Sequence, residues 1–87
     1  MLELVKNKLG ILGDSRDSYL LELIEQAKKE LEYINGVRAD ESNGVIRDYI
    51  CDLVVWKFKE KGAGERPKWL ASNLRDLMIK ETANGSN

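Results

Sequence analysis

Apolar residues recur along the chain every third or fourth position, which is the spacing of one face of an α-helix. The longest stripe spans about five turns and contains Leu20, Leu23, Ile24, Ala27, Leu31 and Ile34. Asp14 or Ser15 is expected to cap its start, since their side-chain oxygens accept hydrogen bonds from first-turn amides. Asn35-Gly36 is a typical helix end. The pattern predicts a long helix between these signals.

A shorter stripe at the start of the chain predicts a short first helix, and it consists of Leu2, Val5 and Leu9. This helix is expected to stop near Gly10 because glycine is favoured just beyond a helix end. Ile11 and Leu12 are then expected to anchor the connection to the long helix.

A last helix is predicted after Pro67. Proline fits a first helical turn because amide hydrogens in that turn have no partner within the helix, so the hydrogen that proline lacks is not needed there. Its apolar positions are Trp69, Leu70, Leu74, Leu77 and Met78. We expect Trp69, like Trp56 in the preceding helix, to lie in the core. From Ala83 onward the residues are small and polar, so 83–87 is predicted to be a flexible tail.

The segment 45–58 is predicted to be a helix with two separate apolar faces. The broad face contains Val45, Ile46, Tyr49, Ile50, Leu53, Val54 and Trp56. The second face contains Cys51, Val55 and Phe58. A small monomeric domain rarely needs both, so the second face indicates a partner; for Phe58 the alternative is burial beneath the first helix or the tail. Asp40, Ser42 and Asn43 are candidate caps for the start of this helix.

Together these elements predict an all-α fold, because alternating strand patterns, internal repeats and domain linkers are not found in the sequence. The expected architecture is a small bundle of three main antiparallel helices plus a short N-terminal helix. The connections are short, with a turn at Gly62-Ala63-Gly64, and short connections favour antiparallel neighbours. The third helix should lie in the middle, and residues 1–82 should form a single domain.

Composition narrows the ways in which such a fold can be stabilised. The chain has 87 residues, of which 43% are hydrophobic and 33% charged, as in soluble folded proteins. Domains this small are commonly supported by disulfides, a metal or oligomerisation. With one cysteine and no histidine, oligomerisation remains. The N-terminus resembles neither a signal peptide nor an anchor, and no apolar run is long enough to span a membrane.

Charge is distributed unevenly although the net charge is only −1. Residues 14–41 contain eight acidic and four basic side chains, whereas residues 57–68 contain five basic and two acidic ones. The basic segment could contact nucleic-acid phosphates, face the acidic second helix of a neighbour, or simply be solvated. Protein contact is the preferred functional choice because the chain is acidic overall and lacks a basic recognition helix. Complementary patches on one molecule favour head-to-tail contacts, which can close into a ring.

Catalytic, cofactor and metal sites are not predicted. Asp48 and Asp52 share a helical face, but no histidine or third acid joins them, so a solvated polar strip is the simpler interpretation. Cys51 lacks an imidazole that would activate it and is expected to be packing material. We therefore expect no enzyme activity, no cofactor and no small-molecule substrate. The predicted partner or oligomer interface contains Cys51, Val55, Lys57, Phe58, Lys59, Lys61, Arg66 and Lys68.

The order of these features resembles the small head-tail connector, or adaptor, proteins of tailed bacteriophages and prophages. The matching segments are Leu4-Val5-Lys6 through Ile11, Asp17 through Ala27, Val45-Ile46 through Trp56, and Pro67 with Leu70, Leu74 and Leu77. The resemblance implies a structural protein, often labelled a DNA packaging protein, that forms an oligomeric ring. Such a ring joins the portal of the DNA-filled head to the tail.

The same resemblance implies the partners and the location. The partners would be identical subunits, the portal protein and a tail or stopper protein, with non-specific proximity to packaged DNA and no membrane. The protein would lie in the host cytoplasm during assembly and then at the head-tail junction of the virion. Two alternatives remain open: a small helical regulatory or adaptor protein that binds one partner, and a nucleic-acid-binding helical domain.

Overall fold

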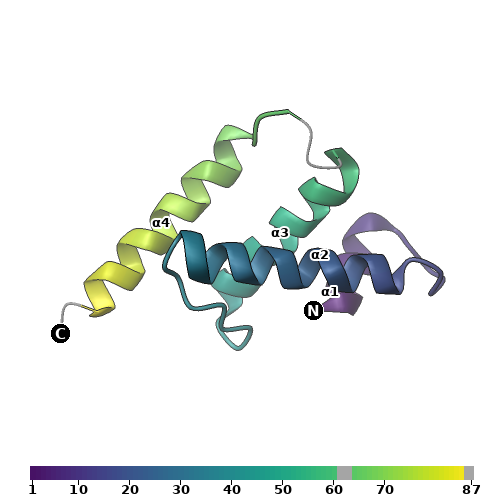
Figure 1. Ribbon diagram of the computed structural model, residues 1–87, viewed down its shortest axis with the longest axis horizontal. Coiled ribbons are helices and arrows are strands. Elements are labelled where there is room, and N and C mark those ends of the chain that lie inside the picture. The colour runs from purple at the N-terminus through teal and green to yellow at the C-terminus, as the bar shows by residue number, and fades with distance from the viewer. Residues whose placement is uncertain (61–63, 86–87) are drawn as a thin grey trace.

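The computed structural model describes residues 1–60 and 64–85, with side chains through Lys80. These residues form the helices α1 (Leu2–Leu9), α2 (Asp17–Lys29), α3 (Gly44–Glu60) and α4 (Lys68–Gly85), and a π-helical turn, η1 (Glu30–Ile34), extends α2 (Figure 1). The described part of the chain contains no strand. The all-α prediction is confirmed.

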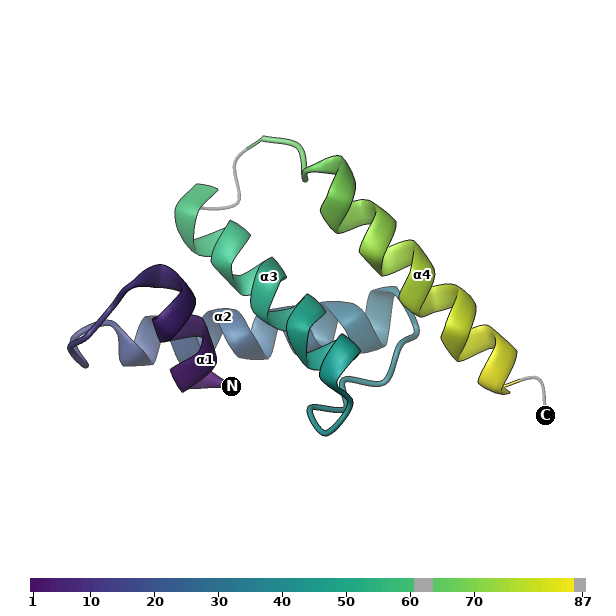
Figure 2. The same ribbon diagram turned by 180° about the vertical axis from the view of Figure 1, so that it is seen from behind.

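Helix α3 occupies the centre of the molecule, as its wide apolar perimeter predicted. It packs against α1, α2 and α4, whereas α4 packs against α3 alone among the described elements. Helices α3 and α4 run antiparallel in both views, and α2 crosses α3 on another side (Figures 1 and 2). The resulting shape is elongated, with extents of 45 × 28 × 19 Å.

A single hydrophobic core draws on every helix. Its largest completely enclosed side chains are Val5, Leu20, Leu31, Val37, Ile50, Cys51, Leu53, Val54 and Leu70. The broad face of α3 is buried as expected, except at Val45, which lies in the first turn and is 56% exposed, and at Trp56, which is partly buried. Because burial of apolar surface is the main stabilising contribution to folding, α3 is the element on which the other helices depend.

The helix ends follow the predicted glycine signals. Gly10 and Gly36 adopt left-handed conformations with φ of 72° and 71°, which other residues adopt only with strain. Beyond Gly36, the Val37 amide donates to the Leu31 carbonyl at 3.0 Å, and both side chains are buried. This arrangement ends η1 and returns the chain to the core.

The start of α3 is capped by Asn43, one of the three predicted candidates. Its Oδ1 accepts hydrogen bonds from the amides of Val45 at 3.0 Å and Ile46 at 3.3 Å. Asp40 accepts instead from the Ser42 amide at 3.0 Å. The Asp40 carboxylate also accepts from the Ser42 hydroxyl at 2.5 Å, and these two hydrogen bonds, the hydroxyl bond first, lower the pKa of the Asp40 carboxyl. The polar loop is therefore organised around two side-chain acceptors, the Asp40 carboxylate and the Asn43 amide oxygen.

The predicted cap of α2 is wrong. Helix α2 begins at Asp17, and its N-cap residue is Arg16, without a side-chain capping bond. The Asp14 carbonyl instead accepts from the Asp17 amide at 3.1 Å, forming a turn ahead of the helix. The expected anchoring by Leu12 is also wrong, because Leu12 is 99% exposed.

Two apolar residues expected in the interior are exposed. Ile34 is 76% exposed, because η1 has π-helical hydrogen bonding, and the extra residue in its turn rotates later side chains away from the α-helical stripe. Trp69 is 52% exposed, because α3 is the one described element that packs against α4, and it contacts the neighbouring apolar stripe. Trp56, in contrast, is partly buried against the core.

The boundary of the predicted tail differs from the structure. Helix α4 continues to Gly85, into the segment 83–87 that the sequence assigned to a tail. Ser86 and Asn87 lie outside the described residues, as do Lys61 and most of the predicted turn at 62–64.

Candidate interaction surfaces

The second apolar face of α3 is mostly covered by the chain itself. Cys51 is completely buried, and burial raises the pKa of its thiol, so it cannot touch a partner in this conformation. Val55 and Phe58 are partly buried against the core. The structure thus provides within one chain much of the cover that the sequence had assigned to a partner, and contact at the exposed edges of Val55 and Phe58 stays a prediction.

Phe58 is covered by the beginning of α2. The Tyr19 ring lies at a tilt of 48° with its centre 6.0 Å from that of Phe58. The Arg16 guanidinium lies 5.5 Å from the Phe58 ring centre, a distance at which a cation is attracted to the ring face. The alternative predicted for Phe58 was burial beneath the first helix or the tail. The two residues that contact its ring, Arg16 and Tyr19, belong to neither segment.

Two ion pairs hold α1 in place. Lys6 Nζ lies 2.9 Å from Asp17 Oδ1, and Lys8 Nζ lies 3.0 Å from Asp52 Oδ1. Hydrogen bonding to these carboxylates raises the pKa of both lysines. Asp52 therefore takes part in an interhelical ion pair. No cluster of three or more potential metal-ligating side chains occurs within the described ranges.

The basic segment meets an acid of its own chain. Glu30 in η1 lies 3.5 Å from Lys57 Nζ through Oε1 and 2.5 Å from Arg66 Nη2 through Oε2. The Arg66 guanidinium also lies 5.6 Å from the Trp56 ring centre. The sequence analysis considered contact of this basic segment with the acidic second helix of a neighbour, whereas Lys57 and Arg66 pair with an acid of their own chain.

The other predicted basic residues are differently placed. Lys59 at the end of α3 and Lys68 at the start of α4 are exposed. Lys61 lies outside the described residues. Of the basic part of the predicted interface, Lys59 and Lys68 are therefore the side chains that the structure leaves accessible.

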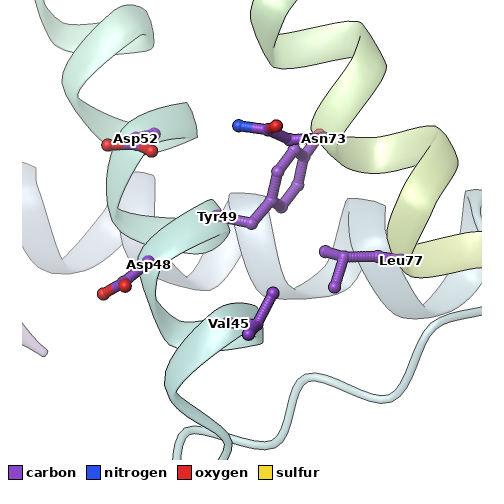
Figure 3. Close-up of a pocket in the computed structure, with 6 residues that line it drawn as sticks. All are labelled: Val45, Asp48, Tyr49, Asp52, Asn73 and Leu77. Atoms are coloured by element: carbon purple, nitrogen blue, oxygen red, sulfur yellow. The ribbon is translucent and has the colours of Figure 1, made fainter. Parts of the chain in front are cut away.

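A small hollow of about 200 Å³ lies between α3 and α4 and is lined by Val45, Asp48, Tyr49, Asp52, Asn73 and Leu77 (Figure 3). Tyr49 and Leu77 point between the helices, whereas the Asp48 and Asp52 carboxylates point away from α4. The Tyr49 hydroxyl is buried without a hydrogen-bond partner of good geometry among the described residues. Burial raises its pKa, with Glu30 reinforcing this shift and Arg66 opposing it. The hollow contains no paired nucleophile and base.

Accessible apolar side chains occur where the sequence analysis did not place an interface. Those of large size are Leu12, Tyr19, Leu21, Tyr33, Ile34, Val45, Trp69, Met78 and Ile79. Three of them belong to α4, which packs against α3 alone in the described part of the chain. The sequence signal for this was available. Trp69 and Met78 lie beside the stripe formed by Leu70, Leu74 and Leu77, Ile79 lies opposite it, and one packing partner can cover only that stripe.

No helix in the described part of the chain is long and apolar enough to cross a membrane.

Comparison with known proteins identifies the family. No curated protein and no solved structure matches the chain significantly. The family model of the phage gp6-like head-tail connector proteins matches residues 1–78, a span that includes α1, α2, α3 and most of α4. The chain therefore belongs to the phage gp6-like head-tail connector family, whose members are structural proteins of the phage.

Proposed function

We propose that this protein forms an oligomeric ring that joins the portal of the DNA-filled head to the tail. The observation that carries the proposal is the family match over residues 1–78. The proposed partners are identical subunits, the portal protein and a tail or stopper protein. Assembly takes place in the host cytoplasm and ends with the protein at the head-tail junction of the virion, close to packaged DNA.

The accessible surface supports a role in protein contacts. Trp69 and Ile79 expose more than half of their side chains, and large apolar side chains in accessible positions are common at protein interfaces. The exposed part of the interface predicted from sequence adds Lys59 and Lys68, with the edges of Val55 and Phe58. Cys51 is left out of this proposal because it is enclosed, and Lys57 and Arg66 already contact Glu30.

Co-purification with the portal protein of the same phage tests the proposal. We expect a complex in which several copies of the chain occupy one portal ring, measured by native mass spectrometry. A monomeric state of the isolated chain is compatible with the proposal, since the portal can act as the template for assembly. Absence of binding to the portal ring would contradict it.

The two alternatives give different results in related measurements. A small adaptor would bind one protein partner as a monomer or dimer and would not assemble in several copies on the portal. A nucleic-acid-binding domain would bind duplex DNA at about 150 mM salt and lose affinity steeply as salt rises. The net charge of −1 gives no general attraction to DNA, so we expect no such binding.

A further inference from the structure

One side of α4 is accessible along its length. The side facing α3 contains Leu70 and Leu77, which are buried. On the opposite side, at intervals of four, three and four residues, lie four exposed residues, Lys68, Ser72, Arg75 and Ile79. We call these four the α4 outer face. Lys68 and Arg75 make no ion pair with any described residue, so this face is basic and ends in an apolar side chain that is 61% exposed.

The corresponding side of α2 carries the opposite charge. The α2 outer face has the same spacing and consists of Ser18, Glu22, Glu25 and Lys29, all exposed. A shallow depression of about 370 Å³ lies along it, and its lining also includes Leu21 and Gln26. Leu21 is 48% exposed and supplies an apolar position beside the two carboxylates. Neither Glu22 nor Glu25 forms an ion pair within the described residues.

We propose that the α4 outer face of one copy docks on the α2 outer face of a second copy of this chain. The contact pairs Arg75 with a glutamate of α2, and it covers Ile79 and Leu21. Both faces are single helical stripes of equal spacing, so two helices can lie side by side along them. This inference rests on the ring proposed above and assigns the surfaces that form it.

The two faces can be occupied at the same time. Helices α2 and α4 do not pack against each other in the described chain, and they lie on different sides of α3 (Figures 1 and 2). A contact between different surfaces of identical subunits is heterologous, and it generates a ring when the rotation between subunits closes. Each subunit thus gives its α4 outer face to one neighbour and its α2 outer face to the other.

Lys29 selects the direction of the helix pair. An antiparallel alignment of the two stripes would place Lys29 opposite Lys68. A parallel alignment places Lys29 opposite Ile79 and Glu25 opposite Arg75, so like charges do not meet. Since juxtaposed like charges oppose association, the parallel arrangement follows, and Glu25 with Arg75 becomes the charge pair to test.

Charge reversal on each face is the experiment. Arg75→Glu and Glu25→Arg should each weaken assembly on the portal about 10-fold per contact, because an attraction becomes a repulsion. The chain that carries both changes should regain wild-type assembly. Arg47→Glu, an exposed reversal on α3, is the charge-matched control, and Glu22→Arg combined with Arg75→Glu should restore less. Copies bound per portal ring are counted by native mass spectrometry, and circular dichroism verifies that each variant is folded.

The possible outcomes separate this proposal from the proposed function. If both single variants assemble like the wild type, or the double variant is no better than they are, the assignment of these faces is overturned while the ring stands. Loss with Arg75→Glu but not with Glu25→Arg would place the portal on α4 and overturn the contact between copies. If the wild type forms no ring on the portal, the proposed function itself is lost, and this inference with it.

Discussion

At the scale of single residues, identical side chains have different environments that depend on their place in the fold. Leu20 is completely buried, whereas Leu12 is 99% exposed. Leu20 belongs to a periodic stripe, and several helical turns of the same face share its contacts with α3. Leu12 lies in a connection without such a repeat. Periodicity therefore identified the buried leucine, and local sequence did not identify the exposed one.

These two leucines give a matched test of the core. Leu20→Ala should lower the free energy of unfolding by about 2–5 kcal/mol, because it removes buried contacts and leaves a cavity. Leu12→Ala makes the same chemical change and should alter it by less than about 0.5 kcal/mol. Urea denaturation followed by circular dichroism measures both. Similar losses for the two variants would show that Leu12 is covered in solution.

At the scale of elements, Glu30 connects three parts of the fold. It lies in η1, and it contacts Lys57 in α3 and Arg66 just before α4. All three side chains are less than one-third exposed. Since α3 is the single neighbour of α4 among the elements that the structure describes, this network adds a second attachment near the start of α4. An acidic residue of the segment that extends the second helix thus pairs with cations of its own chain, while other acidic residues of that helix lie on the surface.

Neutralising Glu30 should weaken this attachment. Glu30→Gln leaves two partly buried cations without a carboxylate, and we expect a loss of about 1–2 kcal/mol in unfolding free energy, less than for a fully buried pair. Glu32→Gln, two residues later and exposed, is the control and should have little effect. Chemical denaturation at low and high salt measures the difference. Equal stability of the two variants would mean that the Glu30 contacts contribute nothing measurable.

At the scale of the whole molecule, several groups couple folding to proton binding at high pH. Burial raises the pKa of Cys51 and Tyr49 above their ordinary values of 9.0 and 10.0. Carboxylate partners raise the pKa of Lys6 and Lys8 above 10.5. In each case the folded chain retains a proton that the unfolded chain releases at lower pH. The stability contribution is therefore complete below about pH 9 and is lost as pH rises further.

We expect the free energy of unfolding to be constant between about pH 7 and 8.5 and to decrease from about pH 9 upward. The first part of this decrease belongs to Cys51, so Cys51→Ala should delay its onset to about pH 10, where Tyr49 follows. Urea midpoints measured across this range, each variant compared with itself at pH 7.5, provide the test. An onset that does not move in Cys51→Ala would show that the thiol is accessible in the folded chain.

The sequence by itself determined the helices, the central place of α3 and most of the core positions. Leu23, Ile24 and Leu53 are examples. Each lies in an apolar stripe that repeats at helical spacing, so the buried face can be recognised without knowing which segment packs against it. The same matching segments indicated the phage connector family, which the family model confirmed. Glycine signals located the ends of α1 and η1, because left-handed backbone conformations are a local property.

Only the tertiary structure decided which apolar face is covered. Amphipathic patterning shows that a helix face needs a neighbour, but the neighbour can belong to the same chain or to another. For Cys51, Val55 and Phe58 much of the cover comes from the same chain. For Ile79 and Trp69 on α4 no neighbour within the described chain covers the side chain, because α3 is the single helix beside it. Which side of a helix faces solvent depends on contacts between segments far apart in sequence, and local periodicity does not contain that information.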